Sequence, residues 1–206
     1  SRAVVVNDIA DDFVDRIAKR AQSMRIGHGM DPQTEMGPSV DGSQFKTVLK
    51  YIDIGLEDGA TLVCGGSAAN GKGLEKGYFV RPTVFDYVTP DMRVAREEIF
   101  GPVLSVLRVK DFDEAMLVAN DTEYGLSSSI FTNDAARIFR FVDEIETGMT
   151  HINSPTTGGE AHIPFGGIKG TGIGDREQGS TALDFYTELK VVYVDYTGRK
   201  REGNLY

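Results

Sequence analysis

Three short segments of the 206-residue chain carry residue types that could bind a small molecule. Residues 97–102 have the sequence EEIFGP, in which one isoleucine separates two carboxylates from an aromatic side chain. Residues 151–154 are HINS, and residues 164–179 are PFGGIKGTGIGDREQG. Carboxylates and amides bind hydroxyl groups, aromatic rings pack against flat ligands, and glycine lets a backbone approach a ligand closely. We take these segments as the candidate site.

The segment 164–179 is the most informative of the three. It combines a proline, an aromatic residue and six glycines in one short stretch. Glycine at this density indicates that the backbone needs positive φ angles or close approach at several points. We expect the charged pair Arg176 and Glu177 to begin a helix over 176–184, which would hold the loop at both ends.

In this order and spacing, the three segments closely resemble the C-terminal half of the aldehyde dehydrogenase superfamily. The resemblance extends from Ser1 to about Tyr196. In that family a strand that begins Ser-Arg follows the catalytic cysteine. The resemblance therefore implies that the nucleophilic cysteine and the glutamate base lie upstream of Ser1, that the chain is cut from a longer protein, and that it contains no catalytic residue. The amino-acid sequence around residues 154–156 and 176–179 is most similar to that of 2-oxoglutarate semialdehyde dehydrogenases.

The resemblance assigns the cofactor residues. Glu98 matches the family glutamate that binds the nicotinamide ribose hydroxyls, a role that suits a carboxylate because it can accept from two vicinal hydroxyls. Phe100 matches the aromatic residue that packs beside the nicotinamide. For Glu97 we expect only a solvated position. The choice between NAD and NADP stays open, because the adenosine ribose is bound upstream.

The resemblance also assigns one wall of the substrate tunnel. Phe165 matches an aromatic residue that lines the tunnel near the thiol, and Asn153 matches a structural asparagine that ties its strand to the following loop. The intervening segment is small and polar, so we expect Ser154 and Thr156 to hydrogen-bond the distal carboxylate of an acidic aldehyde. His162 lies in the same segment and is a further candidate for substrate contact.

The composition excludes some partners. Hydrophobic residues make up 40% of the chain and charged residues 26%, which is ordinary for a globular protein. The net charge of −9 argues against nucleic acid and against an anionic membrane surface. No apolar run approaches the ~20 residues that span a bilayer. We therefore expect a cytoplasmic protein.

The other reactive side chains are poor candidates for chemistry. Cys64 is the only cysteine, ends an apolar stretch and has no histidine near it in sequence. Such a cysteine is usually a small core residue, and a single one fits a reducing compartment. The three histidines, His28, His151 and His162, are too dispersed for a metal site.

Apolar periodicity predicts an α/β fold with a mostly parallel, doubly wound sheet and flanking helices, because helices and strands alternate. The apolar faces of the first two helices are expected at Ile9, Phe13, Ile17 and Ala21 after an Asp8 cap, and at Phe45, Val48, Leu49, Ile52 and Leu56. Further helices are expected over 112–120 and 134–145. Strands are expected over 3–6, 60–64, 78–85, 103–109, 126–132, 148–153 and 191–196.

We expect residues 1–185 to form a truncated catalytic domain and residues 186–206 an oligomerisation strand with a polar tail. The resemblance implies a homo-oligomer built through that strand. It also implies a parent enzyme that oxidises a small aldehyde to a carboxylate through a cysteine thioester, with the chain alone inactive. Two alternatives are a non-catalytic oligomerisation or regulatory module and a superfamily member that passes the acyl group to coenzyme A or phosphate.

Overall fold

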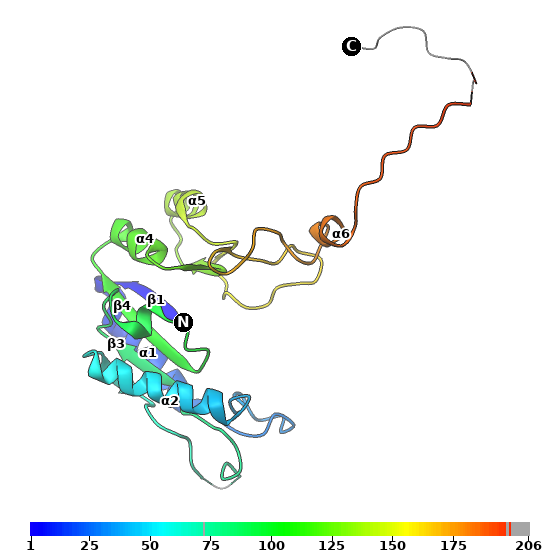
Figure 1. Ribbon diagram of the computed structural model, residues 1–206. Helices are drawn as coiled ribbons and strands as arrows, with labels where there is room; N and C mark the ends of the chain where they lie inside the picture. Colours follow the sequence, from blue (N-terminus) through cyan, green and yellow to red (C-terminus); the bar gives the residue numbers. More distant parts are fainter. Residues whose placement is uncertain (72, 197, 199–206) are drawn as a thin grey trace.

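The computed structural model describes residues 1–71, 73–196 and 198. Its centre is a four-stranded sheet in the order β1-β4-β3-β2 (Figure 1). The strands are β1 (Arg2–Val6), β2 (Thr61–Cys64), β3 (Thr83–Asp86) and β4 (Val103–Val109). Both β1 and β3 run parallel to β4, whereas β2 is antiparallel to β3. The expectation of an α/β fold with a mostly parallel sheet is confirmed.

Helices cover both faces of this sheet. Helix α1 (Asn7–Ser23) packs on one face, where it meets Val84 and Val106. Helix α2 (Gly42–Glu57) and the short α3 (Arg93–Arg96) cover the other face, over Phe85 and Leu107. Alternate residues of β3 and β4 therefore face opposite cores, as the period of a strand requires. Burying each such valine or leucine contributes about 1.5–3 kcal/mol.

Most residues of the expected inner faces of the first two helices pack in the cores, but the outermost ones do not. Ile9 is 56% exposed and Leu56 is 47% exposed, so neither lies in the core. The fully buried residues of α1 are small, namely Ala10, Val14, Ala18 and Ala21, and Phe13 and Ile17 are partly buried against the same core. The expected Asp8 cap is also wrong, because the N-cap position belongs to Val6 and Asp8 lies in the first turn. Small residues let the helix backbone approach the sheet closely, which overrides the pattern of larger apolar residues.

A second group of elements follows β4. Helix α4 (Phe112–Asn120) packs beside β1 and contacts α5 (Ala135–Glu144). Strand β6 (Ser127–Ile130) pairs in parallel with β7 (Met149–Ile152), and β5 (Tyr124–Gly125) pairs antiparallel with β8 (Ile168–Lys169). Figure 1 shows this group above the four-stranded sheet.

The C-terminal part differs from the prediction. The last helix, α6 (Thr181–Tyr186), begins five residues later than the expected 176. The expected strand over 191–196 is not assigned as a strand, and the chain from 187 to 196 runs extended away from the rest (Figure 1), with Leu189 98% exposed. A strand needs a partner strand for its backbone, and the assigned strands of the described residues include none of residues 187–196. Apart from Gly198, the expected tail over 197–206 lies outside the described residues.

A buried ion pair joins the ends of β3 and β4. The Arg108 guanidinium donates to both carboxylate oxygens of Asp86, at 3.0 and 2.7 Å. The side chains are 17% and 5% exposed, respectively. Arg108 also pairs with Asp11 of α1 at 2.7 Å and lies over the Tyr87 ring at 4.3 Å. These contacts raise the pKa of Arg108, with the hydrogen bonds to Asp86 as the largest cause.

Within the described residues, no helix has the length and apolar character that crossing a membrane requires.

Candidate active site

The turn over 97–102 is fixed from α2. The side-chain amide of Gln44 donates to the Ile99 carbonyl at 2.8 Å and to the Phe100 carbonyl at 3.0 Å. Phe100 has φ +53°, a left-handed conformation that is rare for a bulky residue. A Cβ on Gly101 would meet Val48 at 2.4 Å, so only glycine fits there. Gln44 could not be singled out from the sequence, because a glutamine on an amphipathic helix is ordinary.

Glu97 is held by the fold rather than solvated freely. Arg93 donates to both of its carboxylate oxygens, at 2.8 and 2.9 Å, and Tyr51 donates to one of them at 2.5 Å. The Arg93 hydrogen bonds, followed by the Tyr51 bond, lower the pKa of Glu97 from 4.5 to about 2. The side chain is still 40% exposed, so solvent screens the pair.

The next two candidates are presented outward. Glu98 is exposed, and among the described residues its carboxylate has no hydrogen-bond or ion-pair partner. The Phe100 side chain is 80% exposed. The turn, whose backbone is held by Gln44, thus exposes one carboxylate and one aromatic ring. A carboxylate can accept from hydroxyl groups, and an aromatic ring can pack against a flat ring.

The start of β1 lies beside this turn. The Ser1 amine donates to the Val103 carbonyl at 3.3 Å, and Ser105 N donates to the Ser1 carbonyl at 3.0 Å. These bonds place the first residues of β1 beside the residues that follow the turn.

The asparagine at the end of β7 is a structural residue, but its partner is not the expected one. Asn153 has φ +53°. Its side-chain oxygen accepts from Thr132 N at 2.8 Å and its amide donates to the Thr132 carbonyl at 3.0 Å. Asn153 thus ties β7 to the segment after β6 rather than to the loop that follows it.

Phe165 is partly buried and held on both sides. Its backbone exchanges two hydrogen bonds with Glu177, at 2.6 and 2.8 Å. Arg176 Nη1 donates to the Gly167 carbonyl at 2.7 Å. Because Arg176 and Glu177 are taken by these contacts, they do not begin the helix that the sequence predicted. A Cβ on Gly148 would lie 2.0 Å from the Gly166 carbonyl oxygen, so the loop sits directly on the start of β7.

The remaining substrate candidates lie in the loop between Asn153 and Phe165. Ser154 is partly buried and its carbonyl accepts from Ser129 Oγ at 2.5 Å. Thr156 and His162 are exposed, and the His162 ring lies 3.3 Å from the Glu160 carboxylate. The three side chains share one loop, but no contact among them brings them to a common point.

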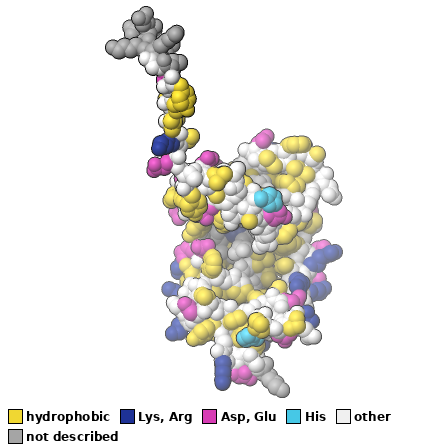
Figure 2. All heavy atoms as spheres, turned by 90° about the vertical axis from the view of Figure 1, so that its right-hand side faces the viewer, with side chains coloured by type: hydrophobic (Ala, Val, Ile, Leu, Met, Phe, Trp, Pro, Cys, Tyr) yellow, Lys and Arg dark blue, Asp and Glu magenta, His cyan; other side chains and the backbone are white. Residues whose placement is uncertain are grey.

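The site segments belong to two different parts of the molecule. The turn with Glu98 and Phe100 belongs to the four-stranded sheet, and Phe165 belongs to the group that follows β4. Figure 2 shows the surface hollowed between these two parts of the molecule. The shallow grooves found among the described residues lie elsewhere, between α4 and α5, and are lined by side chains such as Phe112 and Arg140.

Among the described residues, neither the cysteine nor the histidines form a catalytic or metal-binding centre. Cys64 is 7% exposed and packs in the α1 core, and burial raises the pKa of its thiol. The expectation that Cys64 is a core residue is confirmed. In the described part of the chain, no three His, Cys, Asp or Glu side chains are grouped so that they could hold a metal ion.

Comparisons with known proteins show the family of the chain. Residues 1–192 match the model of the aldehyde dehydrogenase family. The chain is 52% identical to the alpha-ketoglutarate semialdehyde dehydrogenase of Haloferax volcanii and 47% identical to the betaine aldehyde dehydrogenase of Mesorhizobium japonicum, each over 95% of this chain and 40% of the relative. The betaine aldehyde dehydrogenase of Staphylococcus aureus, solved in complex with NAD+, superimposes with a TM-score of 0.87 at 34% identity, over 90% of this chain and 37% of that one.

The chain belongs to the aldehyde dehydrogenase family. It spans about 40% of the length of the curated relatives it matches.

Proposed function

We propose that this chain is the part of an NAD(P)-dependent aldehyde dehydrogenase that binds the nicotinamide end of the cofactor and forms one wall of the substrate tunnel. The parent protein oxidises an aldehyde to a carboxylate through a thioester on a cysteine upstream of Ser1. The bound nicotinamide supplies the hydride acceptor. The chain alone lacks the nucleophile and the base, so it is inactive.

One observation carries this proposal: the turn over 97–102 is clamped while its carboxylate is left free. Gln44 fixes the backbone of the turn, so Glu98 and Phe100 project without a partner among the described residues. A free, exposed carboxylate beside an exposed phenyl ring fits a nicotinamide riboside, whose hydroxyls need an acceptor and whose ring needs a flat contact. Glu98 accepts from the ribose hydroxyls, and Phe100 fixes the plane of the ring.

The substrate is an acidic semialdehyde of the 2-oxoglutarate semialdehyde type. The support is the 52% identity to a relative of that name and the small polar loop with Ser154 and Thr156. Phe165 forms the wall beside the reacting carbon. The betaine aldehyde dehydrogenases among the relatives make a cationic aldehyde the competing candidate.

The substrate is tested in the full-length protein. We expect 2-oxoglutarate semialdehyde to have a higher kcat/KM than betaine aldehyde. Replacing Ser154 and Thr156 together by alanine should raise the KM for the acidic aldehyde and leave the KM for an uncharged aldehyde of similar size unchanged. Equal effects on both aldehydes would contradict the role of the two hydroxyls.

The proposal also covers the oligomeric state and the cellular location of the protein. Residues 1–185 act as the truncated catalytic domain, and the extended segment beyond 186 pairs with a second copy of the protein, with Leu189 among its exposed apolar side chains. Cys64, free and buried, is consistent with a reducing, cytoplasmic location. A superfamily member that transfers the acyl group instead of hydrolysing it would show reduced nicotinamide only when coenzyme A or phosphate is added.

A further inference from the structure

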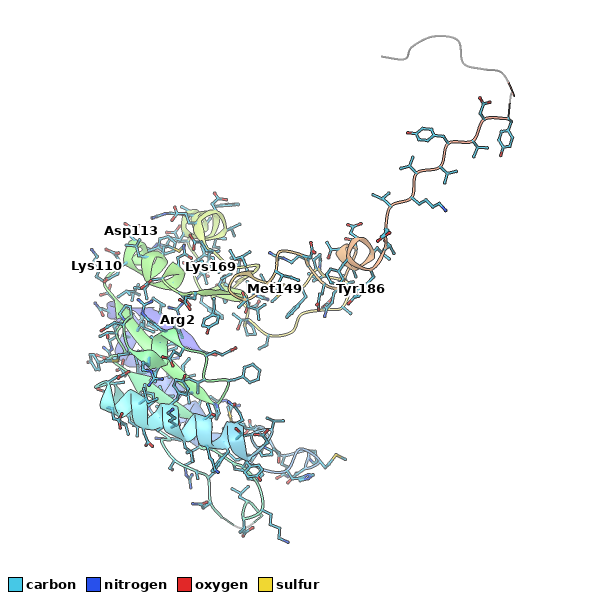
Figure 3. All side chains as sticks on the ribbon, in the orientation of Figure 1. Arg2, Lys110, Asp113, Met149, Lys169 and Tyr186 are labelled. Atoms are coloured by element: carbon cyan, nitrogen blue, oxygen red, sulfur yellow. The ribbon has the colours of Figure 1, made fainter. Side chains whose placement is uncertain are left out.

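We propose that the C-terminal end of α4, residues 118–122, holds the start of β1, the turn that carries Glu98 and the loop that carries Phe165 in a fixed arrangement by binding Arg2, Arg96 and Lys169. We call residues 118–122 the α4 junction. The inference rests on the proposed function, because it concerns how the same site is positioned. Figure 3 labels Arg2 and Lys169, which both lie close to one end of α4.

The first segment is the start of β1. Arg2 Nη1 donates to the Val118 carbonyl at 3.2 Å, and Nη2 donates to the Ala119 carbonyl at 3.0 Å. The last carbonyls of a helix have no partner inside it and carry the negative end of the helix dipole. A guanidinium satisfies both needs, so β1 is tied to the α4 junction at the residue next to Ser1.

The second segment is the loop that carries Phe165. Lys169 Nζ donates to the Asn120 carbonyl at 2.7 Å and to the Thr122 carbonyl at 3.3 Å, and it also pairs with Glu146. Its side chain is only 23% exposed, and its backbone has φ +53°. Such a conformation persists for a lysine where its surroundings fix it.

The third segment is the turn that carries Glu98. Arg96, the last residue of α3, donates to the Asp121 carboxylate at 2.9 Å. These two side chains are 45% and 53% exposed, so this link is the weakest of the three. Asp121 also acts on Arg2: burial lowers the pKa of Arg2, Asp121 raises it, and Arg96 lowers it.

The α4 junction thus gathers three cations from three segments that are far apart in the sequence. Arg96 lies two residues before Glu98 and Lys169 lies four residues after Phe165, and each cation binds a different group on the same five residues. A misplacement of about 1 Å can cost a site ~10²-fold in rate. Arg2, Arg96 and Lys169 are therefore positioning residues that set the separation between the β1 start, Glu98 and Phe165.

Since each cation belongs to one segment, its loss has a particular kinetic signature. In the full-length protein, Lys169→Met should raise the KM for the aldehyde about tenfold and leave the KM for NAD within about twofold. Arg96→Met should do the reverse with a smaller effect. Lys169→Arg keeps the charge and several donors and should restore most of the loss.

Arg140→Met is the matched control. Arg140 of α5 also binds α4, through Asp113 at the other end of that helix, and it pairs with Glu144 within α5. The Arg140→Met variant should have a thermal midpoint lowered about as much as that of Arg96→Met, with unchanged KM values for the aldehyde and for NAD. The double variant Lys169→Met, Phe165→Ala should be no worse than Phe165→Ala alone, because the lysine acts through the phenylalanine.

Hydrogen exchange reports on the junction without any activity. The backbone amides of Phe165 and Gly170 are hydrogen-bonded, and they should exchange faster in Lys169→Met than in Arg140→Met. Equal exchange in the two variants, or equal aldehyde KM values, would overturn the inference. If Lys169→Met does not fold, the KM for NAD of Arg96→Met tests the inference instead. A KM for NAD equal to that of Arg140→Met would then overturn it. A wild-type protein that gives no aldehyde-dependent reduction contradicts the proposed function, while the exchange result still decides the junction.

Discussion

Glu97 and Glu98 are adjacent carboxylates, and the fold binds only the first. Arg93 and Tyr51 hold Glu97 with three hydrogen bonds of 2.5–2.9 Å. Glu98 is exposed and has no such partner among the described residues. The pair is therefore divided into a structural carboxylate and one that is free to bind a ligand.

This division predicts opposite effects of two conservative changes. In the full-length protein, Glu98→Gln should raise the KM for NAD about tenfold, because a hydrogen bond to a charged acceptor contributes about 1.5–3 kcal/mol. Glu97→Gln should lower the thermal midpoint and change that KM less than Glu98→Gln does. Steady-state kinetics with varied NAD measure both. A larger effect on KM from Glu97→Gln would contradict the assignment.

Acid should remove the contribution of Glu97 to stability. Its folded-state pKa of about 2 lies below the ordinary value of 4.5, so the stabilisation is complete above pH 4.5 and is lost as the pH falls through 2. We expect the difference in denaturation midpoint between wild type and Glu97→Gln to shrink over this range. A difference that is constant with pH would show that the Arg93 and Tyr51 contacts do not depend on the charge.

The contact between β7 and the Phe165 loop predicts a steric effect. Gly148→Ala would place a Cβ 2.0 Å from the Gly166 carbonyl oxygen, and this backbone atom cannot move without shifting Phe165. We expect a strong rise in the KM for the aldehyde and a lower thermal midpoint. Gly159→Ala is the control, since its Cβ would make an ordinary 3.8 Å contact with the Phe165 ring. Equal kinetics in the two variants would contradict the proposed role of the loop.

The buried pair of Arg108 and Asp86 predicts a large loss of stability. Arg108→Leu leaves the Asp86 carboxylate, which is 5% exposed, without its bidentate partner. Removing one member of a buried pair costs about 3–5 kcal/mol. Chemical denaturation of the full-length protein measures the change, and adding Asp86→Leu should recover part of it. A loss as small as that of an exposed pair such as Arg16 and Asp12 would show that water reaches the site.

The sequence predicted correctly those elements whose local residue pattern agrees with their burial in the fold. Strand β4 and helix α4 have the predicted bounds, because β4 is apolar on both faces and α4 begins at an Asp111 cap. Strand β3 is shorter than the expected 78–85 and begins after Pro82, which has no N–H for a sheet ladder. The expected strand over 191–196 is not assigned in the single chain, because strand pairing depends on a partner that the local sequence does not contain.

The site itself was only partly predictable. The candidates Glu98, Phe100 and Phe165 came from a family resemblance in short motifs, and their presentation came from the structure. Gln44 and Lys169 escaped notice because their function depends on contacts with residues 55 and 49 positions away, respectively. Arg176 was expected to open a helix, but the Gly167 carbonyl binds its guanidinium. Long-range hydrogen bonds of this kind leave no periodic signal in a sequence.

The most direct test of the account is aldehyde-dependent reduction of NAD by the full-length protein, measured beside its Glu98→Gln variant. We predict turnover of 2-oxoglutarate semialdehyde by the wild type, a raised KM for NAD in the variant, and no turnover by the 206-residue chain alone. Turnover by the chain alone, or a variant with an unchanged KM for NAD, would contradict the account.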